Sequence, residues 1–230
     1  MIICNSRKYV FIHIPKCGGS TISSLLERGL RAQDVTLNRS QHAGWGPFIE
    51  AYRQRYKLFK HSYSHEIASA MGPANYADYF VFTFCRNPFS RAYSAFTFTK
   101  SADAKHRPDS ERYQDIKEMD FEQFLASKWM QERNILQARP QSLWVKDSSV
   151  PVTHYRLEDI DTVLPELATR LYGQGAPMPD KIARANSSAP REAWKSMSPE
   201  AEAMVRDLYA EDFATFGYDD HIDRGPAVDG

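Results

Sequence analysis

The residues whose types and spacing first suggest chemistry form the segment PKCGGST, residues 15–21. Its two glycines allow the backbone to turn sharply and to approach a ligand closely, and Ser20 and Thr21 add hydroxyl donors. A helix that began here would add unpaired backbone N–H groups and the positive end of its dipole. These features predict a turn that binds a phosphate or a sulfate. The alternative is a glycine turn that only changes the direction of the chain.

Lys16 distinguishes this segment from the Walker pattern of ATP and GTP hydrolases. In that pattern a lysine and a serine or threonine follow the glycines, whereas Lys16 precedes them and no such pair follows. Magnesium-dependent hydrolysis of a nucleoside triphosphate is therefore disfavoured. The three cysteines, Cys4, Cys17 and Cys85, are too few for a zinc cluster or a disulfide framework, and we expect no metal.

A second candidate corner lies at residues 85–96, where an apolar stretch ends at Arg86 and an Asn-Pro pair follows. Asparagine is a favoured helix N-cap and proline is favoured at the first helical position, so we expect a helix to begin here. Ser94 lies two turns into that helix. Because a guanidinium can bind a phosphate with two hydrogen bonds, Arg86 and Ser94 are candidates to bind a phosphate monoester. For Arg91, a phosphate contact and an ion pair with an acid are equally open.

Two histidines and a carboxylate lie close together in the chain between these corners. They are His61, His65 and Glu66. Transfer of a group to a hydroxyl requires a base that removes the hydroxyl proton, and histidine and carboxylate side chains commonly serve. His61 is the first candidate, with His65 and Glu66 as alternates. The isolated His42 and His154 are more typical of ordinary surface or hydrogen-bonded side chains.

The surrounding sequence must position these groups. β-branched and aromatic stretches predict strands over residues 8–14, 56–61, 79–85, 142–145 and 150–156. Helical spacing and capping residues predict helices over 21–28, 48–56, 64–71, 87–99, 121–137, 157–172 and 198–213. The charged stretch 101–120 is predicted to be an exposed loop. Strands that alternate with helices indicate an α/β fold, a three-layer sandwich whose central parallel sheet binds ligands at its carboxyl ends.

The composition limits the classes of function. The chain has 230 residues, and its 29 basic and 29 acidic side chains cancel, which argues against binding to nucleic acid through overall charge. No apolar run approaches the roughly 20 residues that span a bilayer, and charges interrupt the apolar N-terminal stretch, unlike in a signal peptide. We therefore expect one cytoplasmic domain over residues 1–220, with no membrane span and with 221–230 as a flexible tail.

Both corners resemble motifs of the PAPS-dependent sulfotransferases, where PAPS is 3′-phosphoadenosine 5′-phosphosulfate. The segment IPKCGGST resembles the 5′-phosphosulfate loop of the carbohydrate branch, the Golgi-type or family-2-like enzymes, and residues 86–96 match the 3′-phosphate motif R-[DN]-P-x-x-R-x-x-S-x-[YF] at every specified position. The resemblance implies a P-loop-like fold and a reaction that needs no metal. The chain departs from the Golgi-type enzymes in that we expect no membrane anchor and no paired cysteines, and this departure favours a soluble, bacterial enzyme. The resemblance implies donor-binding roles for Lys16, Cys17, Gly18, Gly19, Ser20, Thr21, Arg86 and Ser94.

The resemblance also assigns catalytic roles. Lys16 would contact the bridging oxygen on which negative charge develops as the product PAP is released. Residues 59–66 resemble a G-H-x-S-Y stretch whose histidine is the general base, which assigns that role to His61. The match is imperfect because Lys60 replaces the small residue, so His65 and Glu66 remain alternates.

Other parts of the chain carry weaker resemblances. Residues 186–188 resemble part of a loop that closes over the nucleotide, which makes Arg184 and Lys195 candidates to touch it, although the contacts of the 180–197 loop are not assigned. The expected partner is a small-molecule or glycan hydroxyl acceptor, whose identity stays open, as does the oligomeric state. Trp45, Tyr63 and Trp144 could stack on a sugar, although a core position is preferred for Trp144 and Trp129.

Two other functions remain open from the sequence. One is a nucleotide-dependent phosphotransferase. The other is a non-catalytic module that binds PAP or another anion.

Overall fold

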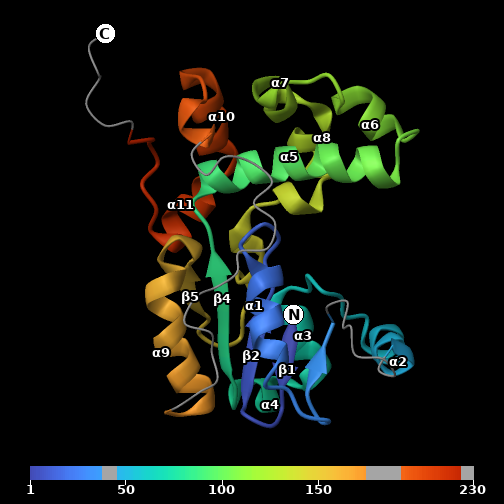
Figure 1. Cartoon of the computed structure of the whole chain (residues 1–230), viewed down its shortest axis with the longest axis vertical. Coiled ribbons are helices and arrows are strands. Elements are labelled where there is room, and N and C mark those ends of the chain that lie inside the picture. Colours follow the sequence, from blue (N-terminus) through green and yellow to red (C-terminus); the bar gives the residue numbers. More distant parts are fainter. Residues whose placement is uncertain (38–45, 175–192, 224–230) are drawn as a thin grey trace. The chain divides into compact units, whose positions relative to one another are not determined.

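The computed structural model describes residues 1–37, 46–174 and 193–223 (Figure 1). The chain divides into two compact units, Met1–Cys85 with Leu143–Ala185 and Arg86–Ser142 with Asn186–Gly230, which we call the first and the second unit. The chain leaves the first unit directly after Cys85 and returns to it at Leu143. The glycine corner thus belongs to the first unit and Arg86 begins the second.

Several predictions fall on residues that the structure does not describe. They concern His42, Trp45, Arg184, residues 186–188 and the tail from residue 224.

A five-stranded sheet forms the centre of the described part of the first unit. In sheet order its strands are β3 (Val35–Thr36), β1 (Ile2–Cys4), β2 (Tyr9–Ile12), β4 (Phe80–Cys85) and β5 (Thr153–Arg156). β2, β4 and β5 run parallel, and β1 is antiparallel to both β2 and β3. The predicted parallel centre is confirmed. Because β2 and β4 are parallel neighbours, the carboxyl ends of these two strands lie at the same edge of the sheet.

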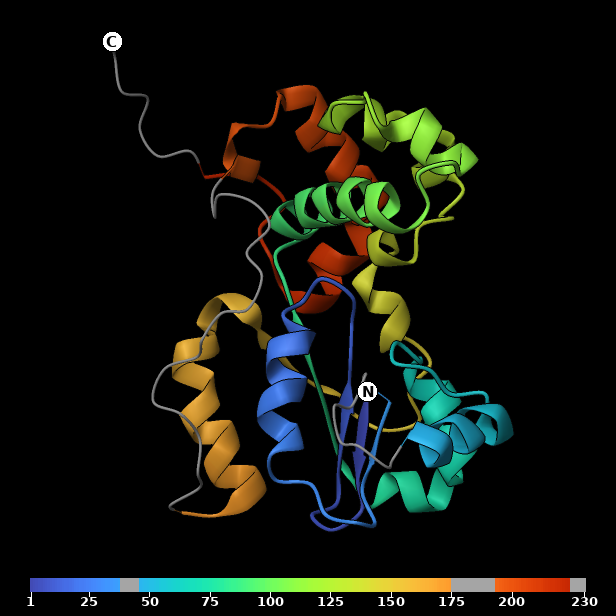
Figure 2. The same ribbon diagram turned by 45° about the vertical axis from the view of Figure 1, so that its right-hand side comes forward.

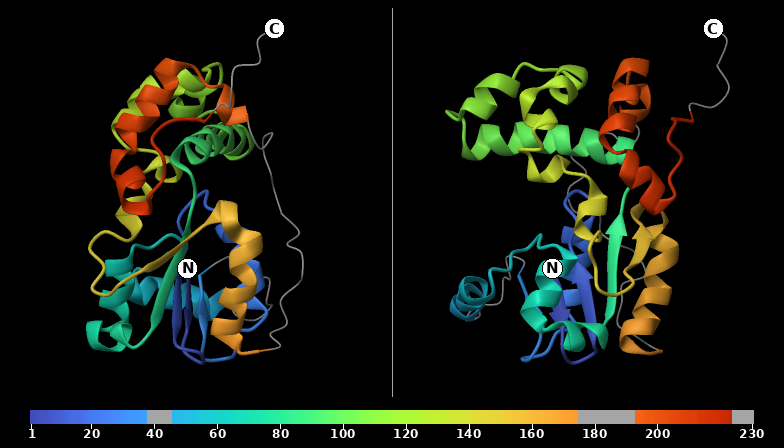
Figure 3. Two further views of the ribbon diagram at one scale, coloured as in Figure 1. Left: turned by 90° about the vertical axis from the view of Figure 1, so that its left-hand side faces the viewer. Right: turned by 180° about the vertical axis from the view of Figure 1, so that it is seen from behind.

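Helices cover both faces of this sheet (Figures 2 and 3). On one face, α1 (Gly19–Glu27) and α9 (Ile160–Tyr172) pack with Phe11, Phe82 and Phe84 in one apolar cluster. On the other face lie α3 (Ser64–Met71) and α4 (Pro73–Ala77), in which Ile67 and Tyr76 are fully buried. Five of the six side chains of β4 are buried, as expected for a strand covered on both faces. The α/β three-layer prediction is therefore confirmed.

The described residues of the second unit form helices joined by turns and contain no strand. Its helices are α5 (Pro88–His106), α6 (Glu111–Ile116), α7 (Phe121–Ala126), α8 (Lys128–Gln131), α10 (Pro199–Leu208) and α11 (Ala210–Phe216). Phe89, Phe124, Tyr209 and Phe213 belong to its apolar core. This unit therefore has a core of its own, separate from the cluster on the sheet.

The starts of two helices agree with the prediction, and a capping side chain marks each of them. The Asn87 side chain accepts hydrogen bonds from the N–H groups of Phe89 and Ser90 at the start of α5, with proline at the first helical position. The Ser198 hydroxyl likewise accepts from the Ala201 N–H, at 3.0 Å, at the start of α10. Both predicted starts are confirmed, whereas the predicted helix 198–213 is divided at Tyr209 into α10 and α11.

Three predicted elements are wrong because local hydrogen bonds interrupt them. The strand predicted over residues 56–61 is absent, because these residues lead into a turn in which the Ser62 N–H donates to the Phe59 carbonyl. The strand predicted over residues 142–145 is also absent, because most of these residues belong to the 3₁₀ helix Gln141–Trp144. The predicted helix 121–137 breaks at Ser127, whose backbone is extended and whose hydroxyl donates to the Phe124 carbonyl at 2.6 Å. Serine hydroxyls compete with the helix for backbone groups in this way.

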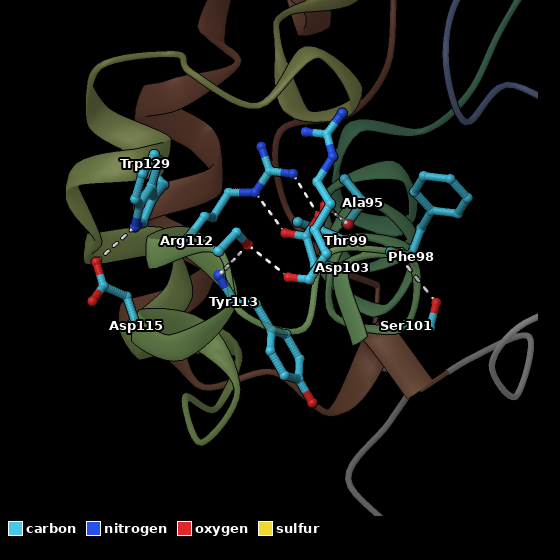
Figure 4. A network of polar contacts seen from close by, with 11 residues as sticks. Ala95, Phe98, Thr99, Ser101, Asp103, Arg112, Tyr113, Asp115 and Trp129 are labelled. Atoms are coloured by element: carbon cyan, nitrogen blue, oxygen red, sulfur yellow. Dashed lines mark hydrogen bonds and ion pairs between the residues drawn. The ribbon is translucent and has the colours of Figure 1, made fainter. Parts of the chain in front are cut away.

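The stretch 101–120 is also not an exposed loop, because α5 continues to His106 and α6 begins at Glu111. A buried ion pair explains the difference. Asp103 is only 3% exposed, and the Arg112 Nε and Nη2 groups donate to its two carboxylate oxygens, each at 2.6 Å (Figure 4). These hydrogen bonds raise the pKa of the Arg112 guanidinium. The charged residues of this stretch therefore hold the two helices together.

Replacing Arg112 with methionine is expected to destabilise the second unit by about 3 kcal/mol, because Asp103 would be left buried without its partner. Urea unfolding followed by circular dichroism measures this change. Arg107→Met removes an exposed arginine from the same segment and is expected to change the free energy of unfolding by less than about 0.5 kcal/mol. Equal unfolding midpoints for the two variants would contradict a stabilising role of the buried pair.

Candidate active site

The glycine corner connects the carboxyl end of β2 to α1. Its backbone adopts the left-handed conformation at Lys16, with φ of 66°, and at Gly18, with φ of 69°. That conformation costs a glycine little but is unfavourable for a lysine. The Gly18 carbonyl accepts hydrogen bonds from the N–H groups of Thr21 and Ile22, at 3.0 and 3.2 Å, which fixes the first turn of α1. The corner therefore holds Lys16 in a strained conformation directly before the helix.

The starts of α1 and α5 differ in how they could bind an anion. The N-cap of α1 is Gly18, and no side chain caps this helix. At α5, in contrast, the Asn87 side chain already accepts from the first N–H groups. Neither first turn contains an acidic residue. The start of α1 thus suits direct binding of an anion to backbone N–H groups, whereas an anion at the start of α5 would depend on side chains.

The side chains of the glycine corner explain its composition. The Cys17 thiol is buried and lies 3.6 Å from the Pro15 carbonyl, so this residue presents only its backbone to a ligand. A Cβ atom at Gly19 would overlap the His13 ring, and one at Gly18 would overlap the Leu157 side chain. Close packing against the His13 ring therefore favours glycine at position 19, and the left-handed backbone favours glycine at position 18.

His61 is held next to this corner by hydrogen bonds at both ends. Its Nδ1 lies 2.7 Å from the His13 carbonyl oxygen, and its own carbonyl accepts from the Trp144 Nε1 at 2.8 Å. The His61 and His13 rings also meet edge to face, with centroids 4.6 Å apart. Because a carbonyl oxygen only accepts, Nδ1 carries the hydrogen, and Nε2 of the neutral ring is then the acceptor. This is the form in which a histidine acts as a general base.

The two alternates have different surroundings. The Glu66 carboxylate accepts from the Tyr63 N–H at 2.8 Å, at the start of α3, and the exposed His65 stacks on the Tyr63 ring. Both residues line an open pocket of about 420 Å³ in the first unit, together with Arg55, Tyr56, Lys57, Ser69 and Ala70. Glu66 thus has a capping role, and His65 lies at this pocket.

In the second unit, a buried polar network holds the backbone of Arg86. The Gln141 side chain accepts from the Arg86 N–H and donates to the Arg86 carbonyl, both at 2.8 Å. Gln141 is fully buried, and its N–H donates to Asp212, which also accepts from the Ser142 N–H. Burial raises the pKa of the Asp212 carboxyl, and the charge of Arg91 opposes that rise. Because both backbone groups of Arg86 are bonded, the direction of its side chain is fixed at its base.

The guanidinium of Arg86 is oriented by Ser90, whose hydroxyl accepts from Nε at 2.8 Å. Ser94 follows Ser90 by four residues on α5, so the two hydroxyls lie on one face of the helix. Arg91 is only 1% exposed. Burial raises the pKa of both Asp212 and Tyr209, and the nearby charge of Arg91 opposes that rise in each. Of the two roles open for Arg91, this burial favours the structural one.

Sequence reasoning missed several residues of these corners. Ser90 could have been found, because a serine four residues after an arginine at a helix start faces it. His13, Gln141 and Asp212 carry no comparable signal, since their contacts join segments that are far apart in the chain. Trp144 is fully buried, as predicted, and Trp129 is partly buried against the core of the second unit. Lys195 lies in the 3₁₀ helix Ala193–Ser196, with its Nζ over the Trp194 ring.

The sheet, the flanking helices and the glycine corner together define a P-loop-like α/β protein. The sequence matches the model of the sulfotransferase family over residues 1–219, and the chain belongs to that family. No curated protein and no solved structure gave a significant match. Among the described residues, no helix has both the length and the apolar character needed to cross a bilayer, and no cluster of three or more acidic, histidine or cysteine side chains could hold a metal ion.

Proposed function

We propose that this sulfotransferase moves a sulfuryl group from PAPS to a hydroxyl group of a carbohydrate. The observation that carries the proposal is the glycine corner, in which an uncapped helix start follows Lys16 and lies beside a histidine with an acceptor Nε2. The match to the family runs through both units, and we infer that residues 1–220 act as one catalytic domain. The three cysteines are buried thiols that form no disulfide, which supports a reducing compartment such as the cytoplasm.

The proposed reaction is a direct, in-line transfer. The backbone N–H groups at the start of α1 and the hydroxyls of Ser20 and Thr21 bind the phosphosulfate. The acceptor oxygen attacks the sulfur atom while His61 Nε2 takes the hydroxyl proton, and the bond between sulfur and the bridging oxygen breaks. Lys16 stabilises the negative charge that appears on that oxygen. The products are a sulfate ester, PAP and a protonated His61, which returns its proton to solvent.

In this proposal the 3′-phosphate binds to Arg86 and Ser94. Arg86 is supported by Ser90 and Gln141, so its guanidinium needs little reordering to bind an anion. Arg86→Ala is expected to weaken PAP binding by about 10–100-fold, which corresponds to a lost charge-assisted hydrogen bond. The affinity for adenosine 5′-phosphosulfate, which lacks the 3′-phosphate, should change little. Calorimetry with both ligands measures the difference, and equal losses for both would contradict the assignment.

The proposed function is tested with PAPS whose sulfur is radiolabelled. The protein is incubated with this donor and a mixed library of glycans and small alcohols. The labelled product is then separated, and its mass is measured by mass spectrometry. Label on one class of acceptor supports the proposal. Phosphate transfer from ATP with magnesium would instead indicate a phosphotransferase. Tight PAP binding without transfer to any acceptor would indicate a binding module.

A further inference from the structure

We propose that Lys60 is a second cation of the donor site, which binds the non-bridging oxygens of the phosphosulfate. The inference rests on the proposed function and concerns this chain in particular. The sulfotransferase stretch that residues 59–66 resemble has a small residue where this chain has Lys60. A small side chain cannot supply a positive charge, so this contribution is an addition to the general pattern.

A tight turn brings Lys60 to the glycine corner. The turn is closed twice, by the Ser62 N–H bonded to the Phe59 carbonyl at 3.2 Å and by the Phe59 N–H bonded to the Ser62 hydroxyl at 2.9 Å. The next side chain, that of His61, is anchored to the His13 carbonyl. The backbone of Lys60 is thus held in place by short contacts on both sides. Its conformation does not depend on the Lys60 side chain.

The Lys60 ammonium lies at the start of α1. Its Nζ is 3.5 Å from the Ser20 hydroxyl oxygen, and Ser20 is the second residue of that helix. An anion bound to the first N–H groups of α1 would therefore meet this ammonium as well as the hydroxyl. The first turn of α1 contains no acidic residue. A flexible lysine stem allows the ammonium to move by the small distance needed to contact the ligand.

Lys60 and Lys16 would serve different parts of the donor. Lys16 belongs to the loop itself and is proposed to act on the bridging oxygen, where charge appears only during transfer. The non-bridging oxygens carry charge in PAPS, in the transition state and, on phosphorus, in PAP. A contact with them strengthens binding of all three to a similar extent, and such uniform binding changes affinity far more than it changes kcat.

The experiment compares Lys60→Ala with Lys57→Ala, which removes an exposed lysine three residues earlier. Dissociation constants are measured for PAP and for adenosine 3′-monophosphate, which lacks the 5′-phosphate. Lys60→Ala should weaken PAP binding by about 10–100-fold and leave the 3′-monophosphate affected by less than about threefold. Lys57→Ala should change both constants by less than about threefold. In Lys60→Arg, which keeps the charge, PAP affinity should stay near that of the unmodified protein.

Three results would overturn the inference. They are an unchanged PAP affinity in Lys60→Ala, an equal loss for both ligands, and an equal loss of PAP affinity in Lys60→Ala and Lys60→Arg, which would indicate a steric role. Thermal unfolding of each variant establishes that it is folded. If the unmodified protein bound PAP and transferred sulfate but Lys60→Ala behaved normally, only this inference would fail. If the unmodified protein did not bind PAP, the proposed function would fail with it.

Discussion

Replacing Lys16 with alanine is expected to lower turnover by about 10²–10³-fold, the usual cost of removing one group that stabilises developing charge. Donor binding should weaken only modestly, because the charge on the bridging oxygen appears mainly as its bond to sulfur breaks. Single-turnover measurements with saturating PAPS give the rate, and PAP titration gives the affinity. Normal turnover with every acceptor that the unmodified protein sulfates would contradict the proposed mechanism.

Lys8 provides a matched control for this substitution. It too is a lysine in the left-handed conformation, with φ of 55°, and it is exposed. Lys8→Ala removes the same charge from the same backbone conformation, so we expect it to leave turnover unchanged. Lys16→Gly adds a second test. Glycine tolerates a φ of 66°, and a rate that stays low in this variant would show that the ammonium, and not the backbone strain, accounts for the activity.

Replacing His61 with alanine should lower the rate by about 10²–10⁴-fold, as expected for loss of a general base. The protein should still bind PAP, because His61 is proposed to act on the acceptor. Added imidazole should restore part of the rate in His61→Gly by occupying the vacated space and taking the proton. Such rescue would not occur if the ring only supported the fold.

His65→Ala and Glu66→Gln separate the base from its alternates. His65 is exposed, and its replacement should leave the rate within about threefold. Glu66→Gln keeps a side-chain oxygen that can accept from the Tyr63 N–H, so α3 should remain folded while the charge is lost. A large loss of rate in either variant, together with near-normal turnover of His61→Ala, would transfer the role of base to that residue.

Local signals in the sequence predicted the parts of the molecule that depend on neighbouring residues. Gly18 and Gly19 marked the corner after β2, and Asn87 and Ser198 marked the starts of α5 and α10. The residues 121–137 did not form one helix, because the Ser127 hydroxyl bonds within its own segment and interrupts an otherwise helical pattern. Apolar spacing alone does not report such a bond.

The support of the candidate site could not be predicted, because it depends on contacts between distant segments. Gln141 reaches Arg86 across 55 residues, and Asp212 reaches Gln141 across 71. His61 bonds to a backbone carbonyl 48 residues earlier, and no side-chain pattern encodes that contact. β1 and β3 were missed for a simpler reason. With three and two residues they are too short for a period-two pattern to appear.

The contrast between an uncapped α1 and a capped α5 bears on how this enzyme's choice of donor could change in evolution. In the proposed assignment, the phosphosulfate end is recognised partly by main-chain N–H groups at the start of α1, and that part of its recognition does not depend on side chains. The 3′-phosphate end of the donor is recognised by side chains, because the Asn87 side chain already accepts hydrogen bonds from the first backbone N–H groups of α5. A single codon change at Arg86 could therefore alter the preference between nucleotides with and without a 3′-phosphate, while the group that is transferred stayed the same.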